Sequence, residues 1–107
     1  MANASINATA SGDNTVVAAG GTNRLIEVLQ YTFITDTDVT VRWKSGSNNI
    51  SGPMPVSASG GIVSVAAPAI AGDFGVLLRT NANEALVLNL STTATVGGHI
   101  TYRLKGV

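Results

Sequence analysis

Hydrophobic and polar residues alternate along several stretches of the chain, most clearly near its C-terminal end. In residues 85–91, Leu86, Leu88 and Leu90 fall on one face, and residues 99–104 again carry a large apolar side chain at every second position. Successive side chains of a β-strand point to opposite faces, so this period of two indicates two half-buried strands. The Thr-rich segment between them, which ends in Gly-Gly, predicts a turn that joins them as a hairpin.

The same pattern predicts core strands over 24–34 and 39–44, beside those over 85–91 and 99–104. The first has apolar residues on both faces and is expected to be central; a helix over 24–30 is the alternative, but the β-branched and aromatic residues after it favour a strand. Shorter strands are predicted at 15–19, 54–58, 62–66 and 74–80, with a loop over 68–73. Many short strands separated by turn signals are typical of an all-β, antiparallel sandwich with a jelly-roll-like arrangement.

The first residues have a different composition. Residues 1–14 are small and polar, and Ile6 is their only large aliphatic side chain. Such a segment buries too little apolar surface to offset the entropy lost on ordering. We therefore expect a flexible N-terminal arm over 1–14, either loose or ordered against a neighbour, and a single β-sandwich domain over 15–107.

Composition narrows the classes of partner. The chain has 107 residues, of which 45% are hydrophobic and 11% charged, with six basic and six acidic residues. This balance gives no electrostatic footprint for nucleic acid. So little charge favours a surface covered by a partner, whereas a soluble monomer with a Ser/Thr/Asn surface is the alternative. No run of apolar residues is long enough for a membrane span, and the N-terminal residues do not have the pattern of a signal peptide, so we expect cytoplasmic synthesis without export.

The residues that could carry chemistry favour structural roles. The single histidine, His99, has no cysteine to join it as a metal ligand and lies on the polar face of its strand. The sequence Asp36-Thr37-Asp38 lacks the further ligands of a calcium loop and is typical of a turn. The two glutamates, Glu27 and Glu84, are not excluded as a hydrolytic pair, but nothing in the pattern favours one. We predict no catalytic residue, cofactor site or metal site, and no enzyme activity.

Basic and aromatic residues offer two further candidates. Arg42 and Lys44 share one strand face, and Arg103 and Lys105 share another. Such stripes are typical of charges that guard sheet edges, with contact to acidic groups of a partner protein as the alternative. Trp43 is interpreted as a core residue; exposed, it could stack on a sugar ring.

Three segments of the second half carry a family resemblance. They are Gly52–Gly61 (GPMPVSASGG), Arg79–Leu90 (RTNANEALVLNL) and Val96–Tyr102 (VGGHITY), in this order. The arrangement is similar to that of small capsid decoration (cement) proteins of tailed bacteriophages, over about residues 52–104. The turn before Glu84 contains glycine in that family; Asn83 stands there in this chain and also tolerates left-handed backbone.

The resemblance implies a virion protein that binds the outer surface of the phage head, contacts the major capsid protein and stabilises neighbouring capsomers. The alternative is a sandwich module of a phage tail, neck or fibre that recognises a glycan or a partner protein. Because three capsomers meet at three-fold and quasi-three-fold sites, we expect a homotrimer, with a dimer as second choice. Its interface is expected to use one sheet face, including Trp43 or Tyr31.

Overall fold

The computed structural model describes residues 2–67, 69–70 and 73–106, and all the regular structure within these ranges is β-strand. No helix in this part of the chain has the length and apolar character needed to cross a membrane. The strands are β1 (Ala2–Ala8), β2 (Gly12–Val17), β3 (Arg24–Thr35), β4 (Val39–Ser45), β5 (Asn48–Asn49), β6 (Met54–Val56), β7 (Val63–Ala66), β8 (Ala69–Ile70), β9 (Asp73–Phe74), β10 (Leu78–Arg79), β11 (Leu86–Leu90) and β12 (Val96–Gly106).

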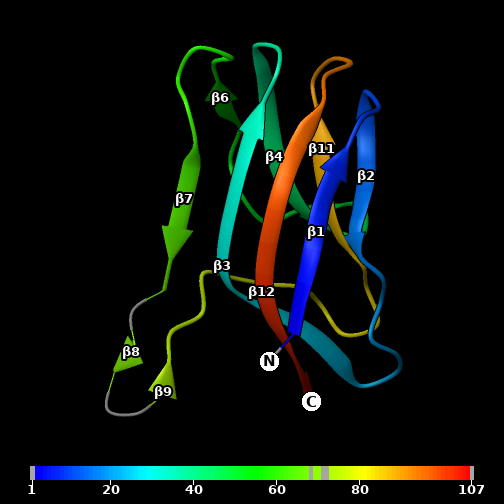
Figure 1. Ribbon diagram of the computed structural model, residues 1–107. Coiled ribbons are helices and arrows are strands. Elements are labelled where there is room, and N and C mark those ends of the chain that lie inside the picture. The colour runs from blue at the N-terminus through cyan, green and yellow to red at the C-terminus, as the bar shows by residue number, and fades with distance from the viewer. Residues whose placement is uncertain (1, 68, 71–72, 107) are drawn as a thin grey trace.

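Two antiparallel sheets pack face to face. The first sheet has the order β1-β12-β3-β10, with β7 also paired to β3. The second sheet has the order β2-β11-β4-β5, with β6 also paired to β4. The first four strands alternate between the sheets, and β11 and β12 each enter the middle of one, so the strand order is that of a jelly roll (Figure 1). The predicted all-β sandwich is confirmed.

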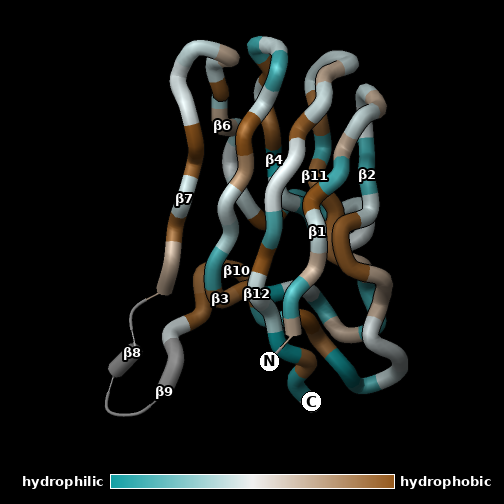
Figure 2. Tube along the Cα trace, viewed as in Figure 1, coloured by the Kyte–Doolittle hydropathy of each residue, from teal (hydrophilic) through white to brown (hydrophobic). Residues whose placement is uncertain are grey.

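The core lies between the sheets and uses every second residue of the long strands. Figure 2 shows the resulting alternation of hydrophobic and hydrophilic segments along the tube. Tyr31 is central: its ring lies 5.8 Å from that of Phe33 and 5.3 Å from that of Trp43. The buried cluster consists of Ile6, Ala8, Val17, Ile26, Val28, Tyr31, Phe33, Val39, Val41, Trp43, Val56, Leu86, Leu88, Leu90, Ala94, Val96 and Ile100.

A β-bulge explains why β3 looked apolar on both faces. Its register with β12 shifts where Thr101 pairs with Gln30 and Tyr102 pairs with Val28, so Leu29 is the extra residue. The bulge reverses the side-chain alternation, which lets Ile26 and Val28 before it and Tyr31 and Phe33 after it all join the core.

The predicted hairpin of 85–91 and 99–104 is wrong, because the two strands lie in different sheets. β11 pairs with β2 and β4, whereas β12 pairs with β1 and β3. The connection passes from one sheet to the other at the end of the sandwich, with Ala94 buried and the amide of Asp36 donating to the carbonyl of Thr95. The two apolar faces therefore cover each other, and Gly97 and Gly98 lie within β12 instead of forming a turn.

The boundary between a flexible arm at 1–14 and a sandwich at 15–107 is also corrected. Residues 2–8 form β1 in continuous register with β12, and residues 12–17 form β2. Ile6 and Ala8 are buried in the core, while Asn3, Ser5 and Asn7 face outward. Ala4 and Ala8 occupy inward positions of β1 on either side of Ile6.

The segment between β7 and β11 differs in detail from its prediction. The strand expected over 74–80 is replaced by the short β9 and β10, and part of the loop expected over 68–73 lies outside the described residues. Asn83 adopts φ 59°, so the left-handed conformation expected before Glu84 is confirmed.

Candidate interaction surface

The outward face of the first sheet carries neutral side chains over four neighbouring strands. Cross-strand register places them in rows from β1 through β12 and β3 to β7. We call this surface the neutral face, and it consists of Asn3, Ser5, Asn7, Gln30, Thr32, Ile34, Ser64, Ala66, Gly97, His99 and Thr101. None of these residues is Asp, Glu, Lys or Arg. Depletion of charge is a property of the centres of protein interfaces.

Hydrogen bonds between side chains connect the strands of the neutral face. The Gln30 amide donates to the Thr101 hydroxyl at 3.0 Å, and that hydroxyl donates to Asn3 Oδ1 at 3.0 Å. The hydroxyls of Thr32 and Ser64 lie 2.9 Å apart. These contacts fix the side-chain positions, so a partner would meet an ordered surface.

His99 lies near the middle of the neutral face. Its row runs from Ser5 on β1 through His99 to Thr32 on β3 and Ser64 on β7. The side chain is exposed, as predicted for the polar face of its strand. No group of His, Cys, Asp and Glu suited to a metal ion occurs in the described part of the chain.

A charged cluster borders the neutral face where β10 joins the sheet. Glu27 is fully buried and lies between Arg79 and Arg103, its cross-strand neighbours. Arg79 Nη2 lies 2.6 Å from Glu27 Oε2, and Arg103 Nε lies 2.7 Å from Glu27 Oε1. Burial raises the pKa of Glu27, but the two guanidinium groups lower it by more, so the pKa lies below its ordinary value. The cluster ties β10 and β12 to β3.

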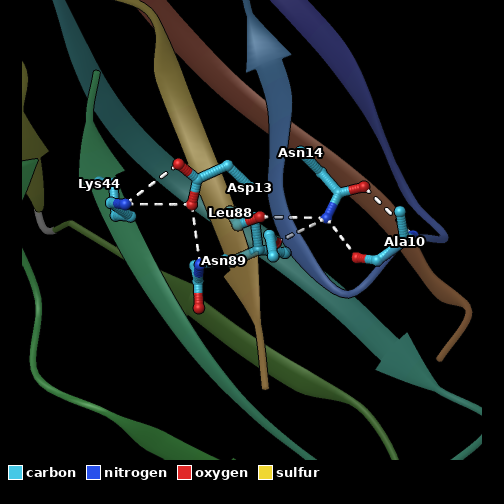
Figure 3. A network of polar contacts seen from close by, with 7 residues as sticks. Ala10, Asp13, Asn14, Lys44, Leu88 and Asn89 are labelled. Carbon is cyan, nitrogen blue, oxygen red and sulfur yellow. Dashed lines mark hydrogen bonds and ion pairs between the residues drawn. The ribbon is translucent and has the colours of Figure 1, made fainter. Parts of the chain in front are cut away.

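The outward face of the second sheet has a different character, because it carries paired charges. Lys44 Nζ donates to both carboxylate oxygens of Asp13, at 3.0 and 3.1 Å, and Asn89 Nδ2 donates to Asp13 Oδ1 at 2.7 Å (Figure 3). The amide of Asn89 and the ammonium of Lys44 lower the pKa of Asp13. Nearby, Asn14 donates to the carbonyl of Ala10 at 2.8 Å and closes the turn between β1 and β2.

The two predicted basic stripes lie on different sheets and are partly neutralised. Arg42 and Lys44 belong to the second sheet, where Lys44 pairs with Asp13. Arg103 and Lys105 belong to the first, where Arg103 pairs with Glu27. They do not combine into one basic surface.

The Asp36–Asp38 segment connects β3 and β4, as predicted for a turn, but its carboxylates accept hydrogen bonds from the backbone of other loops instead of their own. Asp36 Oδ1 accepts from the amide of Thr95 at 2.8 Å, and Asp38 Oδ1 accepts from the amide of Ala58 at 2.8 Å. Hydrogen bonds from Thr95 and from the Thr37 hydroxyl lower the pKa of Asp36. These oxygens are therefore already engaged in holding loops together.

The remaining acidic candidate, Glu84, stabilises the loop before β11. Its Oε1 accepts from the Ser45 hydroxyl at 2.6 Å and from the Asn81 amide at 3.1 Å. These hydrogen bonds lower the pKa of Glu84, and the bond from Ser45 has the largest effect. Glu84 and Glu27 are thus engaged by separate partners, and the structure does not bring them together as a pair.

The aromatic candidates lie inside the sandwich. Trp43 is 0% exposed and Tyr31 is 8% exposed. The core role of Trp43 is confirmed, whereas stacking on a sugar and the predicted contribution of Trp43 or Tyr31 to a subunit interface are wrong, because both rings are covered by the opposing sheet. Trp43 Nε1 is a buried donor without an acceptor among the described residues.

A shallow hollow of about 350 Å³ lies beside β4 and β6. Asp38, Thr40, Pro55, Ser57 and Ser91 contribute to its lining. Its polar groups are engaged locally: the Ser91 hydroxyl accepts from the amide of Thr40 at 2.9 Å, for example. The neutral face, which spans four strands, is the stronger candidate for binding.

Comparison of the chain with protein-family models, curated proteins and solved structures finds no match.

Proposed function

We propose that this protein is a capsid decoration (cement) protein of a tailed phage, which binds the outer surface of the head and stabilises contacts between capsomers. The observation that carries the proposal is the neutral face: an ordered sheet surface free of Asp, Glu, Lys and Arg. Association with a protein lattice requires little desolvation of charge on such a surface. The motif resemblance over residues 52–104 supplies the identity of the lattice.

A decoration protein acts by binding the assembled shell in preference to free subunits, which shifts the assembly equilibrium without chemistry. Many identical contacts on one shell add to its stability even when each contact is weak. A rigid sandwich suits this role, because a surface that is ordered before binding loses less entropy on docking. The major capsid protein is the partner that the proposal requires, and the capsid surface is the location.

The test is binding of purified protein to heads prepared without it, measured by co-sedimentation and by cryo-electron microscopy. Thr32→Lys places a charge in the centre of the neutral face and should weaken binding ~10-fold or more, since it buries an unpaired charge. Thr15→Lys, an exposed position on β2 of the second sheet, is the matched control and should bind like the wild type. Density on the tail, neck or fibre, with none on the head, would favour the binding-module alternative. Equal binding by both variants would remove the neutral face as the contact surface.

A further inference from the structure

Strand β1 forms an unprotected margin of the first sheet. It has 7 residues and pairs with β12 in continuous register, and it has no other partner strand among the described residues. It has no charge, proline or bulge, the devices that normally prevent edge strands from pairing with other chains. Other marginal strands differ: β2 carries Asp13, β6 carries Pro55, β7 has only 4 residues, and β5 and β10 have 2 residues each.

The backbone of β1 is available for a second partner. In an antiparallel pair, only alternate residues direct their N–H and C=O groups at the neighbouring strand, so the other residues of β1 direct theirs away from β12. No described strand pairs with β1 on that side, and the backbone bonds found in turns and loops do not involve residues 2–8. Figure 1 shows β1 at the margin of its sheet, with β2 belonging to the opposite layer.

The sequence of β1 is nearly the same when it is read in reverse. It reads Ala-Asn-Ala-Ser-Ile-Asn-Ala, with Ser5 at the centre. In an antiparallel pair of two copies centred on Ser5, Asn3 stands opposite Asn7 of the second copy and Ser5 opposite Ser5. The inward positions match as well, because Ala4 meets Ile6. Each outward pair therefore joins uncharged side chains that both donate and accept hydrogen bonds.

We propose that two copies of this chain associate through β1, antiparallel about a two-fold axis at Ser5, so that their first sheets form one continuous sheet. In a closed two-fold pair, the β1 edges of the two copies pair with each other, whereas other ways of adding a strand leave one β1 edge unpaired. The pairing favours the dimer over the trimer expected from lattice symmetry. It does not depend on the proposed function and is tested without phage heads.

The dimer should dissociate on dilution. A single ladder of this length lies at the low end of interface size, so we expect a dissociation constant on the order of micromolar. Sedimentation velocity over a wide concentration range should show a monomer–dimer equilibrium. In amide hydrogen exchange, residues 2–8 should be protected at alternate positions in dilute samples and at nearly all positions in concentrated ones.

Charge variants test the register. Asn3→Lys/Asn7→Lys places lysines opposite each other at both outward pairs and should weaken dimerisation ~10-fold or more, whereas Asn3→Lys/Asn7→Asp places opposite charges there and should restore it, most strongly at low salt. Ser64→Lys/Ala66→Lys adds the same charge to exposed positions of β7, at the opposite margin, and should leave dimerisation unchanged. Circular dichroism and thermal unfolding would verify that each variant folds.

Three results would overturn the proposal. They are a wild-type monomer at every concentration, a trimer, and a dimer that the β7 variant weakens while the two-lysine β1 variant does not. Failure of the charge-swapped variant to restore a dimer would show that Ser5 is not at the centre.

Discussion

Replacing Gly98 by alanine should destabilise the protein far more than replacing its neighbour Gly97. An alanine Cβ at Gly98 would lie 1.9 Å from the carbonyl oxygen of Thr32 and 2.7 Å from the Cα of Phe33. Carbon–oxygen contacts between strands normally measure about 3.3 Å or more, so β12 and β3 would have to separate by more than ~1 Å at this point. Both contacts are with backbone, which cannot rotate away. At Gly97 the nearest atom, the carbonyl oxygen of Ile6, lies 4.0 Å from the same Cβ.

The magnitude follows from the strand separation. Overpacking costs ~1–3 kcal/mol, and loss of one or two ladder hydrogen bonds adds about 1 kcal/mol each. The lower entropy of an unfolded chain with alanine returns about 0.4–1 kcal/mol. We therefore expect Gly98→Ala to lower the free energy of unfolding by about 2–4 kcal/mol. Gly97→Ala, which gains the same entropic term without the clash, should be neutral or slightly stabilising.

Urea unfolding followed by circular dichroism gives the free energy of unfolding of both variants and of the wild type, and thermal unfolding gives their Tm. For a domain of this size, a loss of 2–4 kcal/mol corresponds to a fall in Tm of roughly 10–25 °C. Equal stabilities of Gly98→Ala and Gly97→Ala would refute the close approach of β12 to the backbone of β3. If Gly97→Ala were the less stable variant, residues 97 and 98 would face the opposite sides of the sheet from those seen in the structure.

Other predictions concern the charged cluster, the core and the surface. Because the pKa of Glu27 is lowered on folding, its contribution to stability is present above its ordinary value of 4.5 and is lost as pH falls through the lowered pKa. Glu27→Gln should therefore flatten the fall in stability between roughly pH 5 and pH 2 in urea titrations, and an unchanged curve would contradict the ion-paired state. Leu88→Ala should cost ~2–5 kcal/mol in the same assay, and a near-zero change would contradict its burial. Head binding should vary little between low and moderate salt in co-sedimentation, and a steep loss with salt would indicate contacts through charge.

Alternation in the sequence was sufficient to predict the sandwich and its long strands, because large apolar residues at every second position fit few structures other than half-buried strands. Leu86, Leu88 and Leu90 are buried as expected. Strand β1 was missed because its inward residues are mainly alanine, whose burial contributes little to any hydropathy pattern. The signal was nonetheless present: Ala4, Ile6 and Ala8 alternate with polar residues. A period of two identifies a strand even where its inward side chains are small.

Pairing between distant strands was beyond the reach of the pattern. The bulge at Leu29 reverses the faces of β3, and no local signal in the sequence marks it. The crossing between β11 and β12 resembled a hairpin because a short polar connection is common to both arrangements. The neutral face was missed for the same reason, since it exists only when β1, β12, β3 and β7 are placed side by side in register.

The placement of the few charges links the two proposals. Asp13 is paired with Lys44, and Glu27 with Arg79 and Arg103, so much of the charge is neutralised within the molecule itself. Apart from these pairs, the first sheet offers other molecules an uncharged part of its face and an uncharged edge that meet along β1. Such surfaces do not attract partners over long distances by charge. Once contact is made, they select among partners through shape and main-chain geometry. A second copy on the edge would double the neutral face into one continuous surface, so dimerisation and lattice binding would use adjacent parts of the same sheet without competing.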